Sequence, residues 1–176
     1  MKNDVLRLFF ALDCPPRLAA AIASWRDELH LGGRPVAPAN LHLTLAFLGQ
    51  QPCARVAELQ GLASTVRAQA FDLHLDRLAR QRSGLFYLAP SQTPTALLAL
   101  VEGLRQQLGG AAFELESRPF RAHLTLSRHG SPRPLDASPC FDWPVTRFSL
   151  FASEQGPDGS HYRQLHSWPL LRDDRD

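Results

Sequence analysis

Two copies of one short motif hold the residue types that could do chemistry in this 176-residue chain. The tetrapeptide His-Leu-Thr-Leu occurs at residues 42–45 and again at residues 123–126. Side chains of an extended strand alternate between its two faces, so each copy presents a histidine and a threonine together and its leucines on the opposite face. The recurrence of the whole tetrapeptide indicates an internal duplication. Two imidazoles, each beside a hydroxyl, form a candidate acid–base pair.

Hydrolysis of a phosphodiester is a reaction that His42 and His123 could catalyse without a metal. A neutral imidazole can accept a proton from water while a protonated one donates a proton to the leaving oxygen, and an unperturbed pKa near ~6.5 suits both roles at neutral pH. The hydroxyls of Thr44 and Thr125 would share the face of the histidines and could donate hydrogen bonds to phosphate oxygens. Arg121, on the same face by parity, could neutralise part of the phosphate charge.

A metal site is the main alternative use of two histidines. Such a site needs a further histidine or a carboxylate on these strands, and neither motif supplies one. We therefore expect no metal and no other cofactor. Five other histidines have no partner pattern and are interpreted as solvated or structural: His30, His74, His129, His161 and His166.

Hydrophobic periodicity predicts the elements that must position the motifs. Strands are expected at residues 5–13, 40–48, 71–77, 85–89, 120–127, 145–153 and 161–168. Helices are expected from Pro15 to the Gly32-Gly33 pair, along the apolar stripe from Val56 to Val66, and from Pro94 to the Gly109-Gly110 pair. Residues 49–52 are expected to form a turn and residues 131–144 a proline-rich loop.

Strand parity assigns a buried face to each motif strand. The residues expected to pack under helices are Leu41, Leu43, Leu45 and Phe47 in the first copy, and Ala122, Leu124 and Leu126 in the second. The order strand, helix, motif strand occurs twice before a closing hairpin. We therefore predict an α+β fold in which two pseudo-symmetric lobes of antiparallel sheet, with helices packed outside, face a central cleft. Residues 1–176 are expected to form one bilobal domain, because no low-complexity linker separates the halves.

Composition and charge limit the class of protein. Hydrophobic residues make up 44% of the chain and charged residues 20%, as in an ordinary soluble globular protein. A net charge of +2 gives no global field for tight binding of nucleic acid. The three cysteines are isolated, and the apolar run at the N-terminus is short and interrupted by Arg7, which argues against a signal peptide and a membrane span. A cytoplasmic monomer without a membrane partner is the expectation.

Four segments carry a resemblance to a known family: RLFFALD at 7–13, NLHLTLAFLG at 40–49, RPF-x-x-HLTL at 118–126, and S-x-x-x-x-DG-x-x-Y from Ser153 to Tyr162. Each segment is short, but their order and spacing together are specific. The chain resembles the 2H phosphoesterase superfamily, and more closely the bacterial LigT-like RNA 2′,3′-cyclic phosphodiesterases, also called 2′-5′ RNA ligases. Ala122 stands where many members have proline, on the face expected to be buried.

The resemblance implies an activity and roles for individual residues. The expected reaction is hydrolysis of nucleoside or RNA 2′,3′-cyclic phosphate ends to 2′-phosphomonoesters, with possible reversible 2′-5′ ligation. By motif position, His42 would be the proton donor and His123 the proton acceptor, while the two motif threonines would hold the phosphate. Arg118 or Arg121, or both, would bind phosphate. Phe9 could stack on the terminal base, or it could pack at the lobe junction.

Two alternatives stay open at this point. The same fold could act on ADP-ribose 1″,2″-cyclic phosphate or on 2′-5′ oligonucleotides. The chain could also be a non-catalytic module that binds RNA ends. The second alternative predicts affinity without product, whereas the intact pairs of histidine and threonine favour catalysis.

Overall fold

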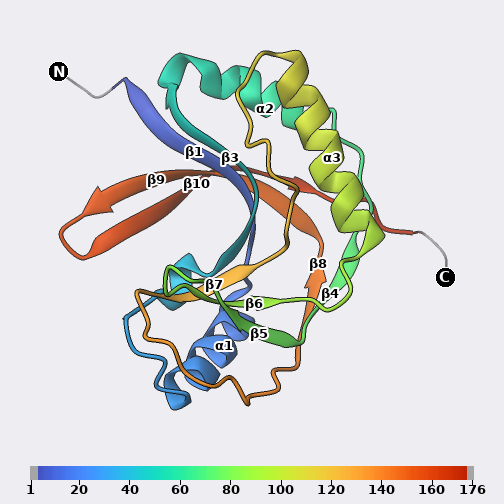
Figure 1. Cartoon of the computed structure of the whole chain (residues 1–176). Coiled ribbons are helices and arrows are strands. Elements are labelled where there is room, and N and C mark those ends of the chain that lie inside the picture. Colours follow the sequence, from blue (N-terminus) through green and yellow to red (C-terminus); the bar gives the residue numbers. More distant parts are fainter. Residues whose placement is uncertain (1–3, 174–176) are drawn as a thin grey trace.

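The computed structural model describes residues 4–173. The elements in chain order are β1 (Val5–Asp13), α1 (Pro16–Glu28), β2 (Arg34–Pro35), η1 (Pro38–Asn40), β3 (His42–Pro52), η2 (Cys53–Arg55), α2 (Val56–Ser64), β4 (Phe71–Leu75), β5 (Arg77–Arg80), β6 (Phe86–Ala89), α3 (Thr95–Gly110), β7 (Leu124–Arg128), β8 (Phe141–Val145), β9 (Arg147–Gly156) and β10 (Gly159–Pro169). Figure 1 shows their arrangement. None of the helices within the described range is long and apolar enough to cross a membrane.

The two motif strands are neighbours at the centre of one sheet. The strand order is β10-β9-β1-β3-β7-β6-β5, with the short β2 also paired to β7, and all of these pairs are antiparallel. Strands β3 and β7 meet in register at one pair of residues, Leu43 and Leu124. The predicted α+β class with antiparallel sheet is thus confirmed. The two halves of the sheet are joined at this pair, so the cleft lies along a seam within one hydrogen-bonded sheet.

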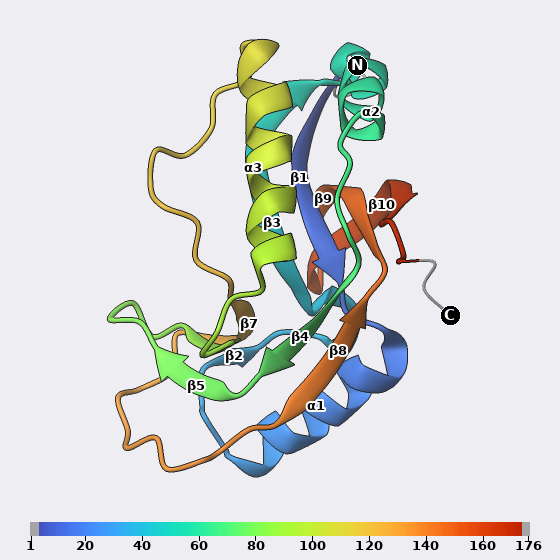
Figure 2. The ribbon, with the colours of Figure 1, turned by 90° about the vertical axis from the view of Figure 1, so that its right-hand side faces the viewer.

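The helices cover the sheet in an exchanged arrangement. Helix α1 follows β1 in the chain but lies beneath the half of the sheet that contains β7, whereas α3, from the second half of the chain, packs against β3 (Figures 1 and 2). Helix α2 lies beside α3. Each half of the sheet is therefore covered by a helix that precedes the other motif strand.

Burial of the motif leucines confirms the parity of the motif strands. Leu43 and Leu124 are fully buried, and the other predicted inward leucines are exposed by 2% or less. Burying a leucine side chain contributes about 1.5–3 kcal/mol, so these positions fix which face of each strand carries the histidines. On the opposite face of β1, Phe9 and Ala11 form a second small cluster with Phe151.

Three sequence predictions are wrong in detail. Phe47 does not face the core, because β-bulges in β3 at Leu45 and Leu48 shift its register against β1 and leave Phe47 exposed by 37%. Residues 49–52 continue β3 to Pro52 and do not form a turn, because they remain paired with β1. The end of the proline-rich segment forms β8, which pairs with β4 in a two-stranded sheet. Pro144 is tolerated there because both strands of such a sheet are edges.

Candidate active site

His42 is the first residue of β3, and its orientation is fixed by its own chain. The carbonyl oxygen of Asn40 lies 2.7 Å from Nδ1, so this ring nitrogen carries a proton and donates it. The other nitrogen, Nε2, lies 3.1 Å from the hydroxyl oxygen of Thr44. The amide of Asn40 also donates to the carbonyl of Ser160, at 2.8 Å, which ties this turn to the β9–β10 hairpin. The reactive nitrogen of His42 is therefore Nε2.

His123 repeats this local geometry. Its Nδ1 donates to the carbonyl of Arg121, at 2.9 Å, so each histidine bonds the carbonyl two residues before it. The duplication seen in the sequence thus extends to the tautomer of the imidazoles. With Nδ1 engaged, His123 also has Nε2 available for proton transfer.

The register of β3 and β7 brings the two motifs together. The pair Leu43–Leu124 lies one residue after each histidine; Thr44 and His123 line the same hollow, and Nε2 of His42 lies 3.1 Å from the Thr44 hydroxyl. The charge of His123 is among the causes of the lowered pKa of His42. The two histidines therefore flank the point where β3 and β7 pair.

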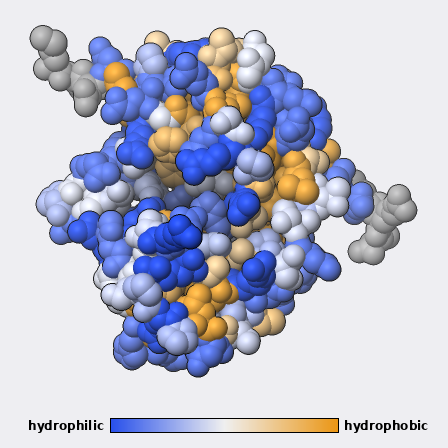
Figure 3. Space-filling model, in the orientation of Figure 1, coloured by the Kyte–Doolittle hydropathy of each residue, from blue (hydrophilic) through white to orange (hydrophobic). Residues whose placement is uncertain are grey.

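The cleft consists of two neighbouring hollows that share the lining residues Thr44 and Phe47. The hollow beside His42 has a volume of about 280 Å³ and the hollow beside His123 about 500 Å³. Thr125 lines neither hollow; it is half-buried on β7, opposite Tyr87. Figure 3 shows the molecule hollowed between the two halves of the sheet, with hydrophilic residues around the opening.

Aromatic rings hold the histidine of the first motif. Phe9 and Tyr162 lie with their ring centroids 5.1 Å and 5.0 Å from that of His42. Phe9 is only 4% exposed and is stacked on Phe151. A ring so buried offers little surface to a base, so this placement favours the packing interpretation of Phe9. The second histidine has one such neighbour, Tyr87, at 5.7 Å.

A β-bulge follows the threonine in both motifs. In the β1–β3 pair the extra residue is Leu45, and in the β6–β7 pair it is Leu126. Because a bulge reverses the alternation of faces, the residues five positions after the histidines, Phe47 and Arg128, line the cleft. Strict parity assigns Phe47 to the core, and it gives no indication of Arg128. Only the matched spacing in the two motifs could have pointed to them.

Arginine side chains concentrate positive charge around the cleft. Arg118 and Arg121 line the larger hollow with Arg105 and Glu116, and Arg7 and Arg128 line the smaller one. None of these five arginines forms an ion pair within the described range 4–173. The net charge of +2 therefore conceals a strongly basic site. Unpaired guanidinium groups around two imidazoles suit an anionic ligand such as a phosphate.

The environment of His42 lowers its pKa. Burial is the largest cause, since it disfavours the charged ring, and the positive charges of Arg128 and His123 add to it, while the hydrogen bond to Asn40 opposes them. The nearby Cys14 is no candidate nucleophile, because burial and the charge of Asp13 raise the pKa of its thiol to about 12. In the described part of the chain, no three histidine, cysteine, aspartate or glutamate side chains are grouped as metal ligands.

Comparisons with known proteins agree with this geometry. A family described as the 2′-5′ RNA ligase superfamily matches residues 14–156. The RNA 2′,3′-cyclic phosphodiesterase of Escherichia coli is 38% identical, over 97% of this chain and 99% of that protein. The protein of the same description from Thermus thermophilus is 32% identical, over 94% of this chain and 90% of its own.

A solved structure gives the same result at the level of the fold. The crystal structure of E. coli LigT complexed with 3′-AMP superimposes with a TM-score of 0.88 at 36% identity, covering 94% of this chain and 98% of that chain. The match extends over both motif strands and both halves of the sheet. The chain belongs to the 2′-5′ RNA ligase superfamily.

Proposed function

We propose that this protein hydrolyses 2′,3′-cyclic phosphate ends of RNA, or of small nucleotides, to 2′-phosphomonoesters. The observation that carries the proposal is the matched pair of imidazoles, each with Nδ1 bound to a main-chain carbonyl, at the starts of two strands that pair at Leu43 and Leu124. Relatives described as RNA 2′,3′-cyclic phosphodiesterases, which align with nearly the whole chain, support it.

The proposed step is an in-line displacement at phosphorus. His123 takes a proton from water as the water oxygen bonds to phosphorus, and the bond between phosphorus and the 3′ oxygen breaks as His42 gives that oxygen a proton. The 2′ ester bond remains, so the product is a 2′-phosphate. The enzyme gains one proton at His123 and loses one at His42, and solvent exchange restores the starting state.

The phosphate-binding groups surround the histidines. Thr44 and Thr125 donate hydrogen bonds to the non-bridging oxygens, and Arg128, Arg118 and Arg121 neutralise the charge that builds on them. Arg128 is added to the predicted set because it lines the same hollow as His42. Phe9 acts from below His42, where its buried ring keeps the imidazole in place.

The lowered pKa of His42 has to be reconciled with its role as the proton donor. In the free protein, burial keeps this ring largely neutral near pH 7. A bound phosphate brings negative charge beside Nε2 and offsets the repulsion by Arg128, which raises the pKa of His42 again. Substrate binding therefore favours protonation of His42, whereas in the absence of substrate the His42 ring stays largely neutral.

The test is product analysis with a dinucleotide that ends in a 2′,3′-cyclic phosphate, incubated with the protein in excess EDTA. We expect a 2′-phosphate product, a bell-shaped dependence of kcat/KM on pH and no loss of rate on chelation. A 3′-phosphate product would reverse the assignment of the leaving oxygen. Full activity of the His42→Ala/His123→Ala double variant would contradict the mechanism.

The proposal also includes the molecular setting. We assign residues 1–176 to one bilobal catalytic domain that acts as a monomer in the cytoplasm, because the histidines and threonines of the site lie in, or directly before, two paired strands of one sheet. Light scattering at micromolar concentration should give the mass of a single chain. An obligate dimer would contradict this part of the proposal.

A further inference from the structure

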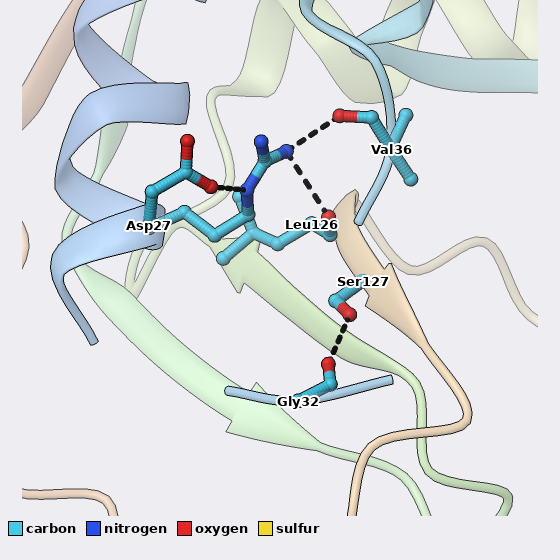
Figure 4. A network of polar contacts seen from close by, with 6 residues as sticks. Asp27, Gly32, Val36, Leu126 and Ser127 are labelled. Atoms are coloured by element: carbon cyan, nitrogen blue, oxygen red, sulfur yellow. Dashed lines mark hydrogen bonds and ion pairs between the residues drawn. The ribbon is translucent and has the colours of Figure 1, made fainter. Parts of the chain in front are cut away.

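Arg26 is a buried arginine on the side of the sheet away from the cleft. Its side chain, in the last turn of α1, is one of the few charged groups in the core, and the residue is 5% exposed. One terminal nitrogen, Nη1, donates to the carbonyl of Val36 at 2.5 Å and to the carbonyl of Leu126 at 3.3 Å (Figure 4). Nε donates to the carboxylate of Asp27 at 3.0 Å, but that carboxylate is 65% exposed.

The carbonyl that Arg26 contacts belongs to the bulge of the second motif. Leu126 is the extra residue of β7, and its carbonyl also accepts the main-chain N–H of Val36, at 2.9 Å. The next residue, Ser127, is 1% exposed and donates its hydroxyl to the carbonyl of Gly32 at 2.9 Å (Figure 4). Arg26 and the segment 32–36 thus form hydrogen bonds to the bulge on the face of the sheet that is away from the cleft.

The segment 32–36 also contacts the main chain of Arg128. Strand β2 pairs with β7 through Arg34 and Arg128. Gly33 has a φ of +72°, and a Cβ added to it would lie 2.2 Å from the carbonyl oxygen of Arg128, so the two main chains are in direct contact. The main chain of Arg128 is therefore closely packed against this segment, with no room for a side chain at position 33.

The choice of arginine at position 26 calls for a physical reason. Burying a guanidinium has a desolvation cost that an exposed carboxylate offsets only in part, and an apolar side chain of similar length would fill the space without it. The guanidinium is explained by its two carbonyl partners, one of which is in the bulge. The Leu126 carbonyl also accepts the main-chain N–H of Val36, so Arg26 is a second donor to that oxygen and adds a further contact to the bulge.

We propose that Arg26 is a positioning residue of the active site, which fixes the bulge at Leu126 and thereby holds Arg128 beside His42 and the phosphate. This inference rests on the proposed function for its effect on rate, but its effect on geometry can be measured in the free protein. Arg26 touches no reacting atom. It acts through the main chain of β7.

The imidazole of His42 reports on this arrangement. Arg128 and His123 are the charges that lower its pKa, Phe9 and Tyr162 pack on its ring, and Arg7 lines the same hollow. If Arg128 swings away, its repulsion is lost and the pKa of His42 rises. Burial is the largest cause of the lowered pKa of His42, and the position of Arg128 adds a change of known direction to it.

The experiment compares Arg26→Met, Arg128→Gln and the double variant by NMR titration of the His42 ring and by kcat and KM on a cyclic nucleotide. We expect Arg26→Met to raise the pKa of His42 in the same direction as Arg128→Gln, and to lower kcat/KM about tenfold. The double variant should be no worse than Arg128→Gln alone, because both changes remove the same interaction. Arg26→Lys, which keeps a donor, should restore part of the rate.

Two further variants separate positioning from general loss of stability. Ile22→Val lies on the buried face of the same helix and should lower the unfolding midpoint without moving the pKa of His42. Ser127→Ala removes the hydrogen bond to the carbonyl of Gly32 and should also raise the pKa of His42. This variant keeps the test available if Arg26→Met does not fold. Additive losses in the double variant, or an unchanged pKa of His42, would overturn the inference. An inactive wild-type protein would refute the proposed function, and the titration of His42 would still test whether Arg26 positions Arg128.

Discussion

The proposed catalytic pair is built from a three-residue unit that is used twice. In each unit a histidine bonds the carbonyl two residues earlier, so a local contact fixes its tautomer. Tertiary structure then distinguishes the copies, because His42 is enclosed by aromatic rings while His123 has one aromatic neighbour. One sequence motif thus yields two imidazoles with different surroundings, as a donor and an acceptor require.

Removing either imidazole tests the pair at the scale of the residue. His42→Ala and His123→Ala should each lower kcat by about 10²–10⁴-fold, the range for general acid–base catalysis, with a smaller change in KM. The measurement is steady-state hydrolysis of a cyclic nucleotide at several pH values. The acidic and basic limbs of the pH profile should be altered by different variants. Loss of the same limb in both variants would contradict the division of roles.

The lowered pKa of His42 gives a signed prediction for stability. As the pH falls through the unfolded value of ~6.5, His42 takes up a proton in the unfolded chain but not yet in the folded one, so the folded state loses stability. Urea unfolding of the wild type and of His42→Gln between pH 5 and 8 would measure this. The free energy of unfolding of the wild type should fall relative to that of the variant as the pH is lowered. A difference that is constant with pH would contradict the lowered pKa.

At the scale of the element, β-bulges determine which face of a motif strand its later residues occupy, and strand periodicity does not predict them. The leucine face of each motif strand could be predicted from the sequence, since alternation holds from Leu41 to Leu45. Beyond the threonine, one extra residue in each strand reverses the faces and brings Phe47 and Arg128 to the cleft. Nothing in the residue types marks a bulge, because it depends on the pairing of one strand against another and on contacts such as that of Arg26.

The place of Phe9 in β1 can be tested separately. Phe9→Leu should lower the free energy of unfolding by about 1 kcal/mol, because the ring is 4% exposed between Phe151 and His42. KM for nucleotides with different bases should stay unchanged relative to the wild type. Denaturant melts and a comparison of cyclic nucleotides would measure both. An increase in KM without loss of stability would instead assign Phe9 to base stacking.

At the scale of the whole molecule, the cleft is more basic than the composition indicates. The total of charges is almost balanced, and only the fold reveals that five arginines without carboxylate partners in the described range line two neighbouring hollows. The α+β class and the central site could be predicted because the motifs repeat. The joining of the two halves through one residue pair could not, because it depends on long-range pairing.

Salt dependence tests the charge of the cleft. The logarithm of kcat/KM for an oligonucleotide with a cyclic end should fall with the logarithm of salt concentration more steeply than for a cyclic mononucleotide. Arg118→Gln should reduce the slope by about 0.7 for each phosphate that the arginine neutralises, and the mononucleotide slope should fall too if that phosphate is the reacting one. Arg163→Gln, whose side chain is paired with Glu154, is the matched control. Equal slopes for both substrates would show that no phosphate beyond the reacting one is bound.

The exchanged helices bear on whether each half of the chain can fold alone. Since α1 lies beneath β7 and α3 packs against β3, a single copy of the repeat leaves the inner face of its own strands bare. Each half of the sheet is covered only when the other half of the chain supplies its helix. Neither half is therefore expected to fold alone.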